Sequence, residues 1–430
     1  MTPVTTDIFI RPLEPLFFGA PSPFNAGETR FSRSMFPPPP MTFQGMIRSH
    51  LLRGATLNQS LDDWSAPARQ ERAELVGTSH SLPDDWHIKG PFPALLEDGS
   101  TVPWLPAPRF LFWKGRGSSP VPGKIYPDGL PHMDDLNNMN SDGSLGQPGQ
   151  YGMPEMFGYK PVTGWMDAEA IFHVLSGQDG NIKPGQIHEG HPPFLKTNQV
   201  QPGIALKRDG NIAEDGMLYR LEHLRFDGCS GFWGRFSGTL DHRLGKDPFS
   251  KGLGGAGRKG RLVAFEKTLS PVFQWTALLK GQHLPEGDGN LGLFWLYLLT
   301  PAAMVPPERR QQSPLLPGHV RLAMDGLPGR VTLVFSGKDP AVQESAYIRC
   351  ISAITGPPVT LGGMDIAKGT TRGNQSYIPA GSAWLLEIKG ENSRHLKEIC
   401  NQLNNTHLLG DPDQACFGFG HTLVGIGPEK

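Results

Sequence analysis

Glycine and proline constrain this chain more than any other feature of its sequence. The chain has 54 glycines and 42 prolines among its 430 residues. Proline removes a backbone donor, and glycine inside a helix or strand costs roughly 0.5–1 kcal/mol relative to alanine. This composition argues against a helical bundle and predicts short strands joined by long loops. Hydrophobic residues make up 38% of the chain, which is enough for a real core.

Charges and cysteines narrow the class of protein. With 40 basic and 41 acidic residues, the formal net charge is −1, which excludes a strongly basic coat for nucleic acid but allows a local basic groove. The four cysteines form no Cys-x-x-Cys pair, which fits a reduced setting. No signal-peptide pattern opens the chain, and its most apolar stretch, LGLFWLYLLTPAAM, is about half a membrane span. We therefore expect a cytoplasmic protein.

Helix signals occur in four segments. In segment 41–54 Thr42 is the expected N-cap, Gly54 the expected end, and one stripe carries Phe43, Met46, Ile47, Leu51 and Leu52. Three further helices are expected in segments 66–77, 165–177 and 393–405.

Strand signals dominate the remainder. Segment 88–115 reads as a hairpin that turns at EDGS, and segment 204–226 is also β. Further strands are expected in segments 294–303, 331–337, 347–356 and 382–390. Helices and strands mix without strict alternation, so the sequence predicts an α+β fold. We expect one domain over 1–270, with an inserted loop at about 115–158, and a second over 271–430.

The segment 416–427 reads CFGFGHTLVGIG and carries two Gly-x-Gly pairs, Gly418 with Gly420 and Gly425 with Gly427. Without Cβ atoms, such a backbone can approach another backbone or a phosphate, and its N–H groups become donors. The spacing matches neither the dinucleotide-binding fingerprint nor a P-loop. Two interpretations stay open: a strand that packs tightly inside the protein, and a strand that cradles phosphates.

Two glycine-rich segments carry basic side chains. KGLGGAGRKGR, at 251–261, contains Arg258, Lys259 and Arg261. DIAKGTTRGNQ, at 365–375, contains Lys368 and Arg372. Arginine on a flexible loop can fork to phosphate oxygens, so both segments are candidates for contacts with a nucleic-acid backbone. The alternative is a solvated run of charge at the tip of a hairpin.

Catalytic constellations are sparse in the sequence. No Gly-x-Ser-x-Gly or His-Glu-x-x-His motif is present. His188 and His191 lie close together, but without obvious further ligands, so we expect no metal and no cofactor. His50, on the first expected helix between Arg48 and Arg53, is the one candidate general acid or base. The alternative is a histidine that is merely solvated or packed.

Several separated stretches resemble one known family. RPLEPLFFGAPSPFNAG and SRSMFPPPPMTFQGMIRSHLL resemble the N-terminal signature of the RAMP proteins, and are most similar to the third subunit of the Cmr complex, the type III-B CRISPR effector. Further matching blocks follow in family order up to GFGHTLVGIG at 418–427. Two blocks depart from the family pattern: GGAGRKGR, at 254–261, stands where Gly-Gly-Glu followed by basic residues is expected, and in GGMD Met364 replaces an aromatic residue. The insert at 115–158 has no counterpart in the family.

The resemblance implies two ferredoxin-like (RRM-type) domains in tandem, with long loop insertions and a glycine-rich C-terminal loop. It implies a noncatalytic subunit in antiviral defence that grips the 5′ handle of the guide RNA. Such a subunit also docks the large polymerase-like subunit and the first backbone subunit, so we expect a hetero-oligomer without a membrane anchor. The resemblance carries a backbone-cradling role onto Gly418, Gly420, Gly425 and Gly427.

The expected RNA contacts therefore combine these glycines with basic residues. The leading basic candidates are Arg258, Lys259, Arg261, Lys368 and Arg372, and the second-rank candidates are Arg33, Arg48 and Arg53. Two alternatives stay open. One is a metal-independent RAMP endoribonuclease that processes precursor CRISPR RNA with His50 as acid or base, and the other is the equivalent subunit of another type III subtype.

Overall fold

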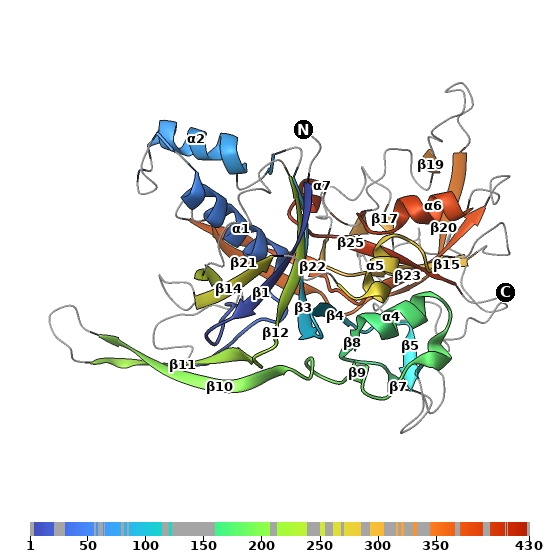
Figure 1. The fold of residues 1–430 in the computed structure, drawn as a ribbon, viewed down its shortest axis with the longest axis horizontal. Helices are drawn as coiled ribbons and strands as arrows, with labels where there is room; N and C mark the ends of the chain where they lie inside the picture. Colours follow the sequence, from blue (N-terminus) through green and yellow to red (C-terminus); the bar gives the residue numbers. More distant parts are fainter. Residues whose placement is uncertain are drawn as a thin grey trace, which may run out of the picture. The chain divides into compact units, whose positions relative to one another are not determined.

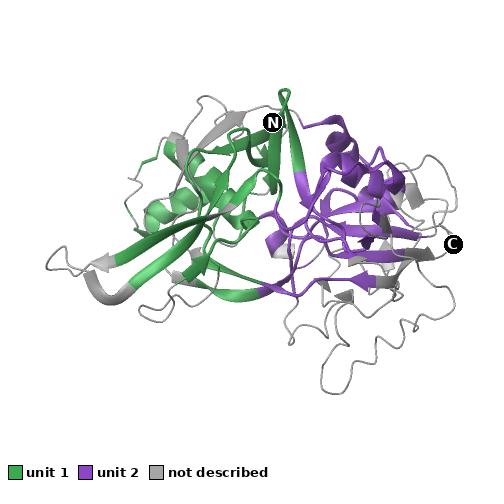
Figure 2. Cartoon of the chain, turned by 90° about the horizontal axis from the view of Figure 1, so that it is seen from below, with its two compact units in different colours: residues 1–103, 192–270, 360–375 green, residues 104–191, 271–359, 376–430 purple. Residues whose placement is uncertain are grey.

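The computed structural model divides the chain into two compact units, each built from three segments (Figure 2). Unit 1 comprises residues 1–103, 192–270 and 360–375, and unit 2 comprises 104–191, 271–359 and 376–430. The structure describes all residues except 1–3, 21–30, 56, 59–62, 64, 79–80, 84–85, 114–119, 123–159, 207–212, 239–249, 254–260, 268–270, 285–292, 305–314, 317–319, 322–329, 333–344, 366–369, 390–395, 409, 411 and 428–430.

Unit 1 is built around four antiparallel strands in the order β14-β1-β12-β3 (Figure 1). β13 continues this sheet beyond β14, and β4 continues it beyond β3. The first helix, α1, lies between β1 and β3 in the chain. The bounds are β1 Val4–Pro12, α1 Pro40–Gly54, β3 His87–Glu97, β4 Ser100–Pro106, β12 Ser230–Gly238, β13 Ser250–Leu253 and β14 Arg261–Lys267.

Helix α1 packs on this sheet through the predicted apolar stripe. Phe43, Ile47 and Leu51 are fully buried, and Phe43 lies so close to Gly234 of β12 that a Cβ there would overlap its ring. The helix ends at Gly54 as predicted, but the prediction of Thr42 as its N-cap is wrong. The helix starts one turn earlier, because Pro40 stands at the first helical position, where a missing N–H costs nothing.

Two other sequence predictions in unit 1 are confirmed. Helix α2, Ala66–Val76, starts where Ser65 accepts a hydrogen bond from the Ala68 N–H. β3 and β4 form the predicted hairpin, and both of its turn residues have left-handed backbone, with φ of 47° at Asp98 and 77° at Gly99. Asp-Gly suits such a two-residue turn, because both residues tolerate positive φ.

A small second sheet in unit 1 has the strand order β10-β11-β2. β10 spans Leu195–Leu206 and β11 spans Ala213–Phe226, which confirms the predicted β-structure of this region. β2, Phe31–Arg33, pairs with β11 in parallel. β10 and β11 extend well beyond the other strands of their unit (Figure 1).

Unit 2 contains a second antiparallel core, with the strand order β20-β23-β15-β25. β19 and β24 extend its two edges. The bounds are β15 Leu293–Leu298, β19 Arg330–Thr332, β20 Ser345–Ile354, β23 Ala383–Lys389, β24 Thr406–His407 and β25 His421–Ile426. The helices of this unit are α4 Ala168–Leu175, α5 Phe273–Leu279, α6 Leu396–Leu403 and the short α7 Pro412–Ala415.

Residues 104–191 lie in unit 2, whereas the sequence analysis assigns them to a first domain over 1–270. Their contacts explain the difference. Phe110 stacks on Trp295 of β15 with ring centroids 4.3 Å apart, and the Tyr297 hydroxyl donates to the Pro106 carbonyl. Leu175 of α4 packs against Gly425 of β25. The predicted domain boundary at residue 270 coincides with one place where the chain passes from one unit to the other. The chain also passes between the two units at other places.

Short elements complete the part of the chain that the structure describes. The remaining strands are β5 Leu111–Trp113, β6 Pro120–Pro122, β7 Lys160–Pro161, β8 Trp165–Asp167, β9 Ile187–His188, β16 Ala302–Ala303, β17 Leu315–Leu316, β18 Val320–Arg321, β21 Val359–Asp365 and β22 Thr370–Ile378. Most of the predicted insert at 115–158 lies outside the described residues. Every helix among the described residues is too short or too polar to cross a membrane.

Candidate nucleic-acid interface

The β10-β11-β2 sheet has one buried and one exposed face, because side chains alternate along each strand. On the buried face, Leu221 is 8% exposed and His223 is 1% exposed. Among the described residues, six large hydrophobic side chains are strongly exposed, and four of them share the opposite face. We call this surface the hairpin face; it comprises Phe31 (42% exposed), Val200 (45%), Ile204 (50%), Leu218 (51%), Arg33 and Arg220.

Strand register brings the basic and apolar side chains of the hairpin face together. Arg220 lies opposite Phe31, and Ile204 lies opposite Leu218. The guanidinium carbon of Arg33 lies 5.8 Å from the centroid of the Phe31 ring. Its Nε lies 3.7 Å from Glu222 Oε2, and the Arg33 side chain is 80% exposed. Exposed ion pairs of this kind are weak, so the guanidinium stays available to a ligand.

This combination of groups suits single-stranded nucleic acid. Bases stack on aromatic rings and on guanidinium planes, and arginine also binds phosphate oxygens. Only Arg33 of the hairpin face is among the residues predicted from the sequence. The alternation of Val200, Pro202 and Ile204 is a signal for a two-faced strand, but it does not tell which face the core covers.

Gly418 and Gly420 lie in the buried turn before β25, and both have left-handed backbone, with φ of 97° and 68°. Their polar groups are used inside the chain. The Gly420 N–H donates to the Pro301 carbonyl at 2.9 Å, and the Gly418 N–H donates to Ala415 at 3.0 Å. The Gly418 carbonyl accepts from the Thr300 hydroxyl at 2.8 Å. The structure thus supplies a conformational reason for both glycines.

Gly425 and Gly427 allow close packing inside unit 2. A Cβ at Gly425 would lie 2.6 Å from Leu175 Cδ2 and 3.2 Å from the Leu175 Cα. A Cβ at Gly427 would lie 2.5 Å from the Leu293 carbonyl oxygen, which accepts the Gly427 N–H at 3.2 Å. A Cβ at position 427 would overlap backbone, whereas a Cβ at position 425 would force Leu175 to shift, so both glycines favour close packing. A role of the four glycines in cradling RNA stays a prediction.

The leading basic candidates are only partly described. Arg258, Lys259 and Lys368 lie outside the described residues, and Arg261 is described only as the first residue of β14. Arg372, on β22, is half-buried and directs Nη1 to the Met41 Sδ at 3.4 Å. The structure therefore does not bring these residues together into one described surface, and their contacts with RNA stay a prediction.

The two arginines of α1 differ in their surroundings. Arg48 donates from Nη2 to the Gly77 carbonyl at 2.6 Å and from Nη1 to the Thr78 carbonyl at 2.9 Å. Both acceptors follow the last turn of α2, where unpaired carbonyls favour a cation. Arg53, in the last turn of α1, is exposed. His50 lies between them and is half-buried rather than fully open to solvent.

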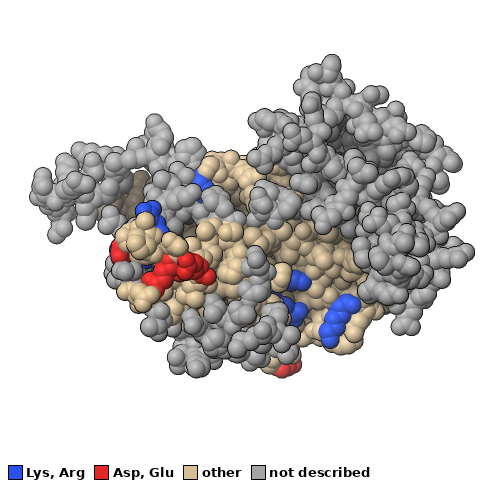
Figure 3. All heavy atoms as spheres, turned by 90° about the horizontal axis from the view of Figure 1, so that it is seen from above, with Lys and Arg blue, Asp and Glu red and all other residues tan. Residues whose placement is uncertain are grey.

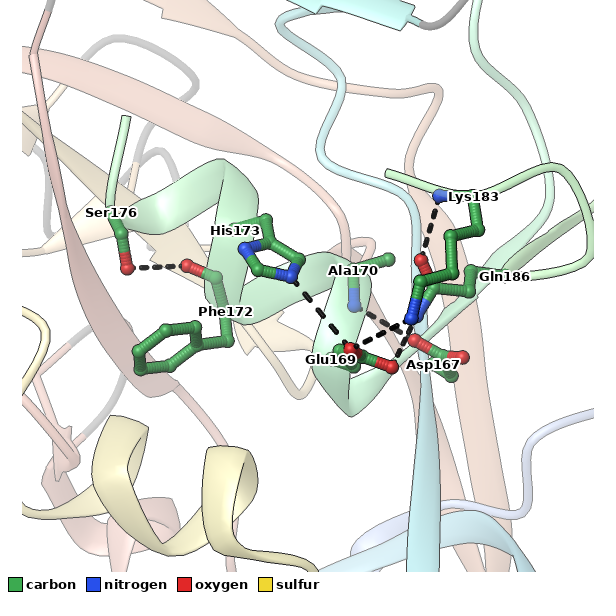
Figure 4. Close-up of polar contacts among 8 residues, drawn as sticks. All are labelled: Asp167, Glu169, Ala170, Phe172, His173, Ser176, Lys183 and Gln186. Atoms are coloured by element: carbon green, nitrogen blue, oxygen red, sulfur yellow. Dashed lines mark hydrogen bonds and ion pairs between the residues drawn. The ribbon is translucent and has the colours of Figure 1, made fainter. Parts of the chain in front are cut away.

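One cluster in unit 2 contains a histidine beside a carboxylate (Figure 4). Glu169 of α4 accepts from Gln186 Nε2 at 2.7 Å and from Lys183 Nζ at 3.3 Å. His173 Nε2 lies 3.9 Å from the same carboxylate, which is too far for a hydrogen bond. These contacts fasten the segment after α4 to the helix. The described residues contain no group of three or more His, Cys, Asp or Glu side chains that could hold a metal ion.

Figure 3 shows one face of the molecule, on which a few described Lys and Arg side chains reach the surface. Some of these basic side chains lie near one another, and others stand alone. Because the net charge is balanced, we expect a nucleic-acid interface to combine a few cations with stacking and apolar contacts.

Chains in two solved structures of the Type III-B Cmr-beta bound to cognate target RNA resemble this chain, each at 14% identity. One of these structures, in a state that also holds AMPPnP, has a TM-score of 0.39 over 92% of this chain and 88% of that chain. The other has a TM-score of 0.38 over 88% and 86%. No curated protein matches the chain.

A family model gives the firmest assignment. The model for the CRISPR-associated protein Cas_Cmr3 matches residues 8–426, which is nearly the whole chain. This match confirms the resemblance to the third subunit of the Cmr complex that the N-terminal and C-terminal blocks indicate. The chain therefore belongs to the Cmr3 family of CRISPR-associated proteins.

Proposed function

We propose that this chain is a noncatalytic subunit of a type III-B CRISPR effector that binds the 5′ handle of the guide RNA. It bridges the large polymerase-like subunit to the backbone subunits. Family membership supports the assignment to a Cmr effector and favours type III-B over another type III subtype. The observation that carries RNA binding is the hairpin face, where Phe31 and Arg33 offer stacking and phosphate contacts side by side.

We also propose that the two cores are ferredoxin-like. A ferredoxin-like domain has the chain order β-α-β-β-α-β. Numbered along the chain, the four core strands of unit 1 have the order 4-1-3-2, and those of unit 2 have the same order. Helix α1 follows the first strand in unit 1, and α6 follows the third strand in unit 2. This arrangement supports two RRM-type cores in one chain, which suits an RNA-binding subunit.

The proposed function is tested by a salt titration of binding to guide RNA with an intact or a scrambled 5′ handle. Preference for the intact handle, without cleavage products after long incubation, is the expected result. Equal binding of both RNAs contradicts handle recognition. Metal-independent cleavage that is lost in His50→Ala would replace the proposal with the endoribonuclease alternative.

The hairpin face is tested with matched phenylalanine variants. We expect Phe31→Ala to weaken RNA binding by about 1–3 kcal/mol, the usual contribution of one stacked base. Phe273→Ala is the control, because Phe273 is 71% exposed and lies in the other unit. If Phe31→Ala keeps full RNA affinity but no longer copurifies the large subunit, the hairpin face binds protein and not RNA.

A further inference from the structure

Arg109 occupies a rigid position in unit 2, between β4 and β5. Its N–H donates to the Gly381 carbonyl at 3.0 Å, and the next turn closes through a Leu111 N–H to Pro108 carbonyl bond of 3.1 Å. The adjacent Phe110 stacks on Trp295, with centroids 4.3 Å apart and planes 9° from parallel. The backbone that carries Arg109 is thus fixed from both sides.

The guanidinium of Arg109 lies against the backbone of Gly356. A Cβ at position 356 would overlap Arg109 Cζ and Nη2, so the glycine makes room for the flat guanidinium. The Gly356 N–H donates to the Ser382 hydroxyl oxygen at 3.4 Å, and Ser382 donates to the Pro379 carbonyl at 2.8 Å. The protein therefore holds this guanidinium in a preformed position against the Gly356 backbone.

This guanidinium lacks an acceptor among the residues that the structure describes. Its Nε is buried and has no hydrogen-bond partner. Burial also lowers the pKa of Arg109. The arginines at 33, 48 and 235 all have acceptors: Glu222, two carbonyls, and Asp7. A partly buried cation without a partner is costly, and native proteins rarely keep one without a reason.

We infer that Arg109 is the anchor of an oxyanion site that binds a phosphodiester of the guide RNA. The Arg109 side chain is half-buried, and no described residue accepts a hydrogen bond from its two Nη atoms, so this end of the fork can take two oxygens of one anion. The neighbouring Pro357 and Pro358 are exposed and apolar, which suits the sugars on either side of a phosphate. The inference rests on the proposed function, which brings a polyanion to this chain.

The test is the salt dependence of guide-RNA binding by the full chain carrying Arg109→Gln. Loss of one phosphate contact reduces the slope of log K against log salt by about 0.7 on single-stranded RNA. We expect this change together with a roughly tenfold loss of affinity at low salt, as for one hydrogen bond to a charged group. Lys183→Gln is the control, because it removes one exposed charge from the same unit.

A second variant separates ligand binding from a structural role. In Arg109→Met the apolar contact with Gly356 is kept and the unpaired charge is removed, so we expect no fall in Tm. A reduced fraction of folded protein changes the apparent affinity but not the salt slope. A fall of several degrees in Tm with an unchanged slope shows that Arg109 is structural and overturns the inference.

Three other outcomes are decisive. If Arg109→Gln has the slope and affinity of the unmodified chain, the inference fails while the proposed function stands. If that variant keeps its slope but no longer copurifies a Cmr subunit, the ligand is a protein carboxylate and the inference is again wrong. If the unmodified chain has no affinity for guide RNA, the proposed function fails and the inference fails with it.

Discussion

At the scale of single residues, the arginines show how far surroundings decide a role. Arg235 of β12 pairs with the Asp7 carboxylate at 2.6 Å, and Arg48 holds two carbonyls at the end of α2. Arg33 lies near the Glu222 carboxylate and is largely exposed to solvent, whereas Arg109 has no hydrogen-bond acceptor among the described residues. Of these four, the sequence singles out only Arg33 and Arg48, as candidate contacts with RNA. Their differences arise from long-range packing.

The Gly425→Ala variant tests the packing role of the glycine strand. Its Cβ would press on the side chain and Cα of Leu175, so we expect a loss of stability of about 1–3 kcal/mol, typical of overpacking. Chemical denaturation measures this loss, and Gly180→Ala is the control, because a Cβ there meets nothing within 4 Å. Unchanged stability with weakened RNA binding would instead support the cradle that the resemblance implies.

Lys89 makes the stability of unit 1 depend on pH. Burial and then the nearby Arg235 lower its pKa from 10.5 to about 8. Below pH 8 both the native and the unfolded chain hold the proton, so the full cost of burying the charge is present. Between pH 8 and 10.5 the native chain has lost a proton that the unfolded chain retains, and stability therefore rises with pH.

The measurement compares the native chain with Lys89→Met across this range. We expect the free energy of unfolding of the native chain to rise by roughly 3 kcal/mol relative to the variant, since one pKa unit corresponds to about 1.4 kcal/mol. A difference that stays constant from pH 7 to 10.5 would show that the ammonium keeps its ordinary pKa.

At the scale of elements, the sequence predicts those whose signals are local. The apolar stripe of α1 and the Asp98-Gly99 turn both act within a few residues, and the corresponding helix and hairpin form as predicted. Phe31 pairs with Arg220 across 189 positions of sequence, and such a pairing leaves no local trace. The position of Arg109 cannot be predicted from local sequence either, because its guanidinium lies against the distant Gly356.

The contact between Arg48 and the end of α2 leads to a prediction about that helix. We expect Arg48→Gln to lower stability by about 1 kcal/mol and to speed hydrogen exchange in the last turn of α2, because two carbonyls lose a charged donor. Arg53→Gln is the matched control on the same helix. Weakened RNA binding with unchanged exchange in α2 would show that Arg48 faces RNA, as the sequence analysis allows.

At the scale of the whole molecule, the chain crosses between its two units several times. Residues 104–191 and 376–430 belong to the same unit, as do 1–103 and 360–375. The sequence predicts a single boundary near residue 270, which is one of these crossings. Which strands share a core depends on contacts between distant residues, such as Phe110 with Trp295, and these leave no local signal.

The interleaved arrangement predicts that a division at residue 270 cannot yield two independent proteins. Fragment 1–270 would carry α4, with Ile171, Val174 and Leu175 buried in the intact chain, but without the β25 strand that Leu175 contacts. Fragment 271–430 would lack the Phe110 ring that covers Trp295. We expect each fragment alone to expose apolar surface, bind a hydrophobic dye and lose cooperative unfolding. Coexpressed fragments should copurify, because each supplies the missing part of the other. Two separately soluble fragments with sharp, cooperative transitions would show that the units fold as consecutive domains after all.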